Sequence, residues 1–514
     1  MTDSFLWIGL TNVVQPINIA AIVMGTLIGM FVGAMPGLSA TMAIALLLPL
    51  TFSFEPATGL AMLASLYLSA MYGGSIAAIL LRTPGTPAAA ATVIDGYPMA
   101  QAGKAGKALG YSLTASLIGG VVSSIVLLTV APMLGRLVLN FGPVEIFAIA
   151  VLGITIIGSL SQGSAVLGLM SGALGLLISM IGMDPTTGTP RFTFGNLNLF
   201  GGVEFTVALI GLFSIPQAIR LMMGGDTQTS SRISNVRDRM LPTAIEFVKM
   251  LPNSIRSAGI GVATGLIPGT GGDTASWFAY NEAKRFSRNK AAFGTGHPAG
   301  IVAPEAANNS VVGGALIPTI SLGIPGSSST AVLMGGLMVH GILPGPTLMT
   351  DHGDVTYTLL WAVLFANVAL FAVGMLFTRA CVSVTKIPNR VVGPVIVVLS
   401  IIGAYALNNS IFEIWLMLGF GLFGFVLDAC KIPTPPLVIG LILGPVLDTS
   451  LEQSLLIGQG NWMIFLQSPI SAVLLGIAFL SILQATPLFS WLGGLRRRSA
   501  SASESEVDSR KTHG

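Results

Sequence analysis

The sequence predicts an all-α, polytopic membrane protein with about 12 transmembrane elements in two repeated halves, which contain re-entrant helical hairpins at Pro-Gly pairs. Three observations predict this fold class. Only 9% of the 514 residues are charged, long stretches carry no charge, and Pro-Gly pairs interrupt apolar segments at four places whose order repeats. We therefore expect a multi-pass membrane protein.

The charge-poor composition excludes an ordinary soluble domain, in which about 25% of residues are charged. Here 53% are hydrophobic and the mean hydropathy is +0.82. A bilayer core of about 30 Å needs about 20 apolar residues per helix, so the uncharged stretches can each hold one or two helices. They are residues 4–54, 57–81, 108–135, 146–183, 355–378, 391–412 and 454–495, with shorter apolar segments at 205–219, 414–427 and 432–447.

Basic residues gather in three clusters, which the positive-inside rule places in the cytoplasm. The clusters span residues 220–256, 284–290 and 496–498. They divide the chain into a first transmembrane half (1–223), a polar cytoplasmic linker (224–247), a second transmembrane half (248–495) and a disordered cytoplasmic tail (496–514). The net charge of +3 gives no reason to expect a nucleic-acid partner.

The two halves resemble each other, which predicts an internal duplication of the kind common in secondary transporters. The alternative is a chance match between glycine-rich apolar segments. The matched positions are Gly29, Gly33, Pro36 and Gly37 with Gly261, Gly265, Pro268 and Gly269; Gly73, Gly74, Pro84 and Gly85 with Gly313, Gly314, Pro325 and Gly326; and Pro143 and Gly158 with Pro388 and Gly403.

The Pro-Gly pairs predict helix breaks at membrane depth, which survive only where protein or a water-filled cavity surrounds them. Helices that start after such a break aim free N–H groups and a positive dipole end at an anion. The predicted carboxylate-binding residues are Pro36, Gly37, Ser39, Thr41, Pro84, Gly85, Thr86, Pro268, Gly269, Thr270, Pro325, Gly326, Ser327 and Ser328. Basic residues on both sides of Pro268 favour a re-entrant hairpin there, the alternative being a tilted pair of interfacial helices.

Polar residues in apolar surroundings predict an ion-coupling site. Glu305 is followed by Asn308, Asn309 and Ser310, and Asp273 lies beside its own Pro-Gly pair. The alternative for Glu305 is a charge at a helix start on the membrane surface. Five other acidic residues and Asp95 are interpreted as loop or interface charges, and His297 and His340 as packed or interfacial. The five are Glu55, Glu145, Asp184, Glu204 and Asp448.

Enzyme motifs are missing from the sequence. The segment QAGKAGKALG, residues 101–110, lacks the first glycine and the final hydroxyl of a phosphate-binding loop, and HExxH and GxSxG do not occur. We expect no enzyme, no cofactor and no metal beyond a possible sodium ion as coupling ion. Energy for transport would then come from an ion gradient.

Three long strings carry a family resemblance: residues 84–110, 268–287 and 297–346. They closely resemble the large membrane subunit of the bacterial tripartite tricarboxylate transporters, over about residues 17 to 483. The resemblance implies a permease that works with a small four-helix membrane subunit and a periplasmic solute-binding protein. It also implies symport of citrate-like tricarboxylates or related carboxylates with sodium ions or protons, in the cytoplasmic or inner membrane of a bacterium. The duplicated halves and the Pro-Gly tips predict alternating access around a midplane site. A passive carboxylate channel or facilitator is the alternative.

Overall fold

The computed structural model describes residues 2–159, 164–184, 187–223, 238–345, 347–384 and 389–485. The predicted linker over 224–237, the tail over 496–514 and the matched residue Pro388 lie outside these ranges. The described chain is helical apart from a ribbon of two short strands, as the sequence predicts. It divides into two compact units, which are described separately.

The first unit comprises residues 1–141, 181–184 and 188–430. Its elements are α1 (Thr2–Val13), α2 (Pro16–Gly33), α3 (Ala40–Thr51), α4 (Pro56–Leu81), η1 (Pro87–Ala89), α5 (Ala90–Met99), η2 (Ala100–Lys104), α6 (Ala105–Val138), β1 (Gly182–Met183), β2 (Pro190–Arg191), η3 (Leu197–Leu199), α9 (Phe205–Met223), α10 (Ala244–Leu266), α11 (Gly271–Phe286), η4 (Lys290–Ala292), α12 (Ala299–Leu322), α13 (Ser328–Val339), α14 (Leu348–Asp351), α15 (Gly353–Val384), α16 (Asn389–Asn408) and α17 (Ile411–Ala429).

The second unit comprises residues 142–180, 185–187 and 431–514. Its helices are α7 (Pro143–Ser159), α8 (Ala165–Ser179), α18 (Thr434–Ile457), α19 (Ile464–Gln467) and α20 (Pro469–Ala485). Helix α18 packs on both α7 and α8. A Cβ added at Gly175 of α8 would lie 2.0 Å from the carbonyl oxygen of Leu437, so the two backbones are in direct contact.

Eight helices of the described chain are long and apolar enough to cross a membrane, and six shorter apolar helices accompany them. The polytopic architecture is thereby confirmed. The count of about 12 elements, the repeat of the two halves and the re-entrant hairpins stay predictions.

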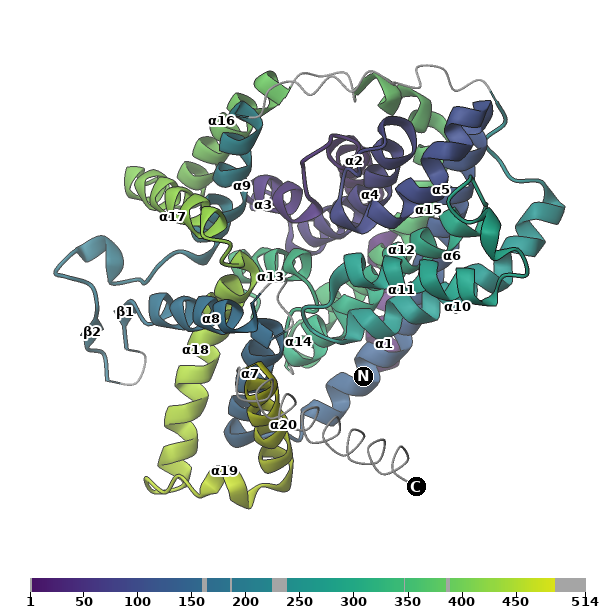
Figure 1. Ribbon diagram of the computed structural model, residues 1–514. Helices are drawn as coiled ribbons and strands as arrows, with labels where there is room; N and C mark the ends of the chain where they lie inside the picture. The colour runs from purple at the N-terminus through teal and green to yellow at the C-terminus, as the bar shows by residue number, and fades with distance from the viewer. Residues whose placement is uncertain are drawn as a thin grey trace, which may run out of the picture. The chain divides into compact units, whose positions relative to one another are not determined.

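Helices α4 and α12 form the interior of the first unit. Both are buried on all sides, and α12 carries buried polar residues as well as apolar ones. Helix α2 packs on α4, and α12 packs on both α6 and α10 (Figure 1). These elements position the polar residues described below.

Glycines set the short distance between α2 and α4. A Cβ at Gly29 would lie 2.3 Å from the carbonyl oxygen of Leu66, and one at Gly33 would lie 2.2 Å from that of Ala70. Small residues allow membrane helices to approach this closely. Gly261 of α10 meets α12 in the same way, since its Cβ would lie 2.3 Å from the carbonyl oxygen of Ala307.

Candidate functional site

Each of the four predicted Pro-Gly pairs lies in a break between two helices. The first break, residues 34–39, joins α2 to α3, and the second, residues 82–89, joins α4 to α5 and contains η1. The third, residues 267–270, joins α10 to α11, and the fourth, residues 323–327, joins α12 to α13. Each pair contains a proline, which lacks a donor N–H, and at the first and third breaks the glycine adopts positive φ.

The first and third breaks have the same backbone shape at their glycines. Gly37 has φ of +89° and Gly269 has φ of +85°. The residues that end α4 and α12 also match, since Arg82 and Gly323 have φ of +58° and +71°. Arg82 therefore holds a left-handed conformation that ordinarily favours glycine.

Within each half of the sequence, the two breaks touch through their backbones. The amide of Gly269 donates to the carbonyl of Gly326 at 3.0 Å, which joins the third break to the fourth. A Cβ at Gly85 would lie 2.0 Å from the carbonyl oxygen of Gly33, which brings the second break to the end of α2. Glycine is required at these close approaches.

Contacts also connect the breaks of one half with those of the other. The hydroxyls of Thr41 and Ser329 are hydrogen-bonded at 2.9 Å, which joins the start of α3 to the start of α13. A Cβ at Gly272 in α11 would lie 3.2 Å from Cβ of Ala88 in the second break. All four breaks therefore meet in one region of the first unit.

Tyr67 of α4 lies in this region, and sequence reasoning missed it. Its buried hydroxyl is 3.1 Å from Oγ of Ser327 in the fourth break. A tyrosine in an apolar helix carries no pattern that marks it as a site residue. Only the packing of α4 against the fourth break reveals its position.

Several of the predicted hydroxyls act as helix caps. Ser39 accepts from the amide of Met42 at 3.1 Å, and Ser327 and Thr330 form a capping box at the start of α13. The hydroxyl of Thr270 donates to the carbonyl of Ile267 at 2.9 Å. Each of these side chains satisfies orphan backbone groups at helix ends.

Three predicted polar side chains are buried without a hydrogen-bond partner among the described residues. They are Thr86 in the second break and Asn308 and Asn309 in α12. The amide oxygen of Asn308 is directed at α11, since it would lie 2.8 Å from a Cβ at Gly272. A buried polar group without a partner costs about 1–3 kcal/mol, so these groups are candidates for contact with a ligand or an ion, although hydroxyls elsewhere in the described residues, such as those of Ser69 and Thr114, also have no partner.

Glu305 is fully buried in α12 and surrounded by hydroxyls, so the interpretation as a charge on the membrane surface is wrong. Oε1 accepts from Ser75 of α4 at 2.6 Å and from Thr92 of α5. Oε2 accepts from Ser112 and Ser116 of α6 at 2.9 and 3.4 Å. The carboxyl group thus connects three further helices without a basic residue among these partners. Ser310, also predicted for this site, donates instead to the carbonyl of Ala307 at 2.9 Å.

The interpretation of Asp95 as a loop or interface charge is also wrong, because Asp95 is fully buried in α5. Its carboxylate accepts from the hydroxyl of Tyr280 at 2.9 Å and from the amides of Gly294, Gly296 and His297 at 2.7–2.9 Å. Four donors from a distant segment compensate for its burial. Asp95 therefore holds the segment before α12 in place.

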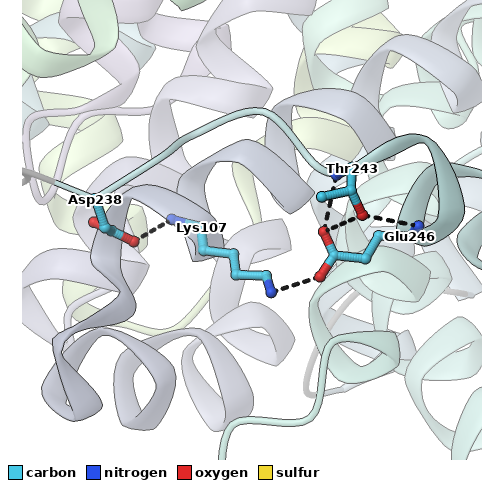
Figure 2. A network of polar contacts seen from close by, with 4 residues as sticks. All are labelled: Lys107, Asp238, Thr243 and Glu246. Atoms are coloured by element: carbon cyan, nitrogen blue, oxygen red, sulfur yellow. Dashed lines mark hydrogen bonds and ion pairs between the residues drawn. The ribbon is translucent and has the colours of Figure 1, made fainter.

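The segment that resembles a phosphate-binding loop has a structural role at the start of α6. The carboxylate of Asp238 accepts from the amides of Gly106 and Lys107 at 2.6 and 2.8 Å. Lys107 forms an ion pair with Glu246 at 2.5 Å, and Glu246 forms a capping box with Thr243 (Figure 2). An aspartate of the same chain thus occupies the place that an anion would take at this helix N-terminus.

Comparison with known proteins identifies the family. Residues 19–439 match the family described as "Tripartite tricarboxylate transporter TctA family". Two proteins of Agrobacterium vitis are similar over most of their own length. The "Uncharacterized 52.8 kDa protein in TAR-I ttuC' 3'region" is 34% identical over 482 residues, which cover 94% of this chain and 96% of that protein. The "Uncharacterized protein in TAR-II ttuC' 3'region" is 32% identical over 225 residues, 44% of this chain and 93% of that protein. No solved structure matches the chain.

Proposed function

Since the chain belongs to the tripartite tricarboxylate transporter TctA family, as the large membrane subunit, we propose that it imports citrate-like tricarboxylates or related carboxylates through a site at the four breaks. The chain is a transporter component and not an enzyme. The observation that carries the proposal is the meeting of the four breaks in one region, beside buried polar groups that have no hydrogen-bond partner among the residues that the structure describes.

The chemistry of the region suits a carboxylate. Helices α3, α5, α11 and α13 all begin at or just after a break, and each helix start offers N–H groups and about half a positive charge. Ser328, at the first position of α13, is half-buried and is not consumed by the capping box. Its hydroxyl and that of Thr86 would orient the carboxylate.

The coupling ion would bind next to the substrate. The amide oxygens of Asn308 and Asn309 suit a small cation such as sodium, because neutral oxygens are ligands of hard cations. Asp273 adds a carboxylate near the third break. The hydroxyl-lined carboxyl group of Glu305 suits a proton. We propose that a sodium or proton gradient drives uptake through these residues.

Alternating access would follow from the two repeated halves. The matched backbone conformations at Gly37 and Gly269, and at Arg82 and Gly323, support a common origin of the halves. A pair of related bundles around a shared site can move relative to each other and expose the site alternately. In the same proposal the protein lies in the bacterial inner membrane with a small four-helix membrane subunit, and a periplasmic solute-binding protein delivers the substrate.

Reconstituted uptake tests the function. The purified protein and its small membrane subunit would be placed in proteoliposomes, with a loaded periplasmic binding protein outside and an imposed sodium or proton gradient. We expect radiolabelled citrate or a related carboxylate to accumulate above its outside concentration. Uptake that never exceeds equilibrium, or that continues without a gradient, would refute coupled transport and indicate a passive facilitator.

Ser328 provides the test of the site. Ser328→Ala removes a hydroxyl beside the fourth break and leaves the cap formed by Ser327 intact. A lost hydrogen bond to a charged ligand is worth about 1.5–3 kcal/mol, so we expect the half-saturating substrate concentration to rise about tenfold or more. The control is Ser53→Ala, an exposed serine that bonds only within its own turn. Equal kinetics for Ser328→Ala and the control would remove the fourth break from the site.

A further inference from the structure

An exposed apolar loop leads from the β ribbon to α9 and has no role in the site described above. The loop comprises residues 192–200. Phe194 is 90% exposed, Leu197 77% and Phe192 55%. Large apolar side chains that gather on one exposed loop mark an interaction surface.

The loop is held in a defined shape. At its base β1 pairs with β2 in an antiparallel register, Gly182 opposite Arg191. Arg191 forms an ion pair with the buried carboxylate of Asp184, and the amide of Met183 donates to the carbonyl of Phe200 at 3.0 Å. The two phenylalanine rings therefore stand on a hydrogen-bonded base.

Backbone conformation adds a second observation. Phe192 and Phe194 have φ of +52° and +50°. This left-handed region costs a residue with a side chain about 1–2 kcal/mol. Strained backbone of this kind concentrates at functional positions. At both strained positions of this loop the aromatic side chain is exposed.

The loop lies on the side of the membrane opposite to the basic linker. Helix α9 has 19 residues, a length of about 28 Å, enough to span the hydrocarbon core. Its last turn contains Arg220 and leads into the basic cluster that predicts the cytoplasm, whereas residues 182–204 contain a single basic residue, Arg191. The loop at the other end of α9 therefore faces the periplasm.

The loop cannot lie in the hydrocarbon core of the membrane, because its backbone is not α-helical. Strands and irregular segments expose N–H and C=O groups that lipid tails cannot satisfy. Phe192, Phe194 and Leu197 are therefore accessible from outside the hydrocarbon core. Clustered aromatic side chains are typical of the centres of protein interfaces.

We infer that residues 192–200 form the docking surface for the periplasmic solute-binding protein, with Phe194 and Leu197 at its centre. This inference rests on the proposed function, because it assumes that a soluble protein on the periplasmic side delivers the substrate. The loop contributes apolar contacts, and the loaded binding protein buries them while it hands over its carboxylate.

Kinetics of uptake test the inference. The double variant Phe194→Asn, Leu197→Ser removes both apolar side chains, and asparagine accepts the left-handed backbone. We expect the concentration of loaded binding protein that gives half-maximal uptake to rise at least about tenfold, since interface anchors contribute about 2 kcal/mol or more. The maximal rate should be retained. The control is Met223→Ser, which removes a largely exposed apolar side chain at the opposite end of α9.

An unchanged half-maximal concentration in the double variant would overturn the inference while the proposed function stands. Absence of uptake by the wild-type protein would instead refute the proposed function. A photo-crosslinker at position 194 tests the docking surface independently of uptake, in proteoliposomes that also contain the small membrane subunit. We expect an adduct with the purified binding protein, and an adduct only with lipid or with the small membrane subunit would overturn the docking assignment.

Discussion

Replacement of Glu305 by glutamine tests the buried carboxyl group most directly. Glutamine keeps one acceptor oxygen, which we expect to face Ser75 and Thr92, because their contacts are shorter than those of Ser112 and Ser116. The new amide NH2 faces the two α6 serines and cannot accept from them.

The cost of Glu305→Gln follows from these contacts. One full hydrogen bond, from Ser112 at 2.9 Å, and one marginal bond, from Ser116 at 3.4 Å, lose their acceptor. A hydrogen bond to a charged group contributes about 1.5–3 kcal/mol, but the serine hydroxyls can turn to their own helix carbonyls. We therefore expect a loss of about 1–3 kcal/mol in the free energy of unfolding, and a larger loss for Glu305→Ala, which removes all four bonds and leaves a cavity.

Two measurements check this variant. Scanning fluorimetry in detergent should give melting temperatures in the order wild type, Glu305→Gln, Glu305→Ala. Uptake in proteoliposomes should lose its dependence on the imposed ion gradient in Glu305→Gln. If the glutamine variant melts with the wild type, the four hydroxyls do not hold the carboxyl group as described. If its uptake also keeps the wild-type ion dependence, Glu305 has no part in coupling.

Two further predictions concern packing and charge. Gly29→Ala should lower the free energy of unfolding by about 1–3 kcal/mol, because its Cβ would lie 2.3 Å from the carbonyl oxygen of Leu66. The control is Gly259→Ala, whose Cβ would have no neighbour within 4 Å. Equal melting temperatures for the two variants would contradict the close packing of α2 on α4. The ion pair with Lys107 lowers the pKa of Glu246 from its usual value of about 4.5 to about 2. The ion pair therefore stabilises the folded protein fully above about pH 4.5, and this contribution is lost as the pH falls toward 2. Glu246→Gln should accordingly lower the melting temperature equally at pH 6 and pH 8 and less at high salt; an effect confined to one of these pH values would contradict the prediction.

The helix breaks could be predicted because their causes are local. Proline removes a backbone donor and glycine accepts positive φ, so the pairs at Pro36 and Pro268 mark their own breaks. The partners of Glu305 could not be predicted. Ser75 and Ser112 precede it by 230 and 193 residues, and no pattern in the sequence indicates which of many serines in apolar helices will face a carboxylate.

The burial of Asp95 could not be predicted from the sequence either. Its interpretation as a loop or interface charge is wrong because Asp95 lies inside α5, a helix that continues through Gly96 and Pro98. The donors that make its burial favourable are the amides of Gly294, Gly296 and His297, about 200 residues away. Propensity is a weak local signal that tertiary contacts override.

Most hydroxyls at the four breaks bond to helix ends, which limits how the proposed site could recognise a carboxylate. Ser39 and Ser327 cap the helices that they precede, and Thr270 bonds to the end of α10, so substitution of any of them would destabilise a helix end in addition to any effect on the proposed site. In the proposed site the side chains left for a substrate are few, Thr86 and Ser328 foremost, and neither carries a charge. Recognition at the breaks would then depend mainly on backbone N–H groups and helix dipoles, which favour negative charge without selecting one carboxylate skeleton. A site of this kind needs its substrate chosen beforehand, which is the role we propose for the binding protein docked on residues 192–200.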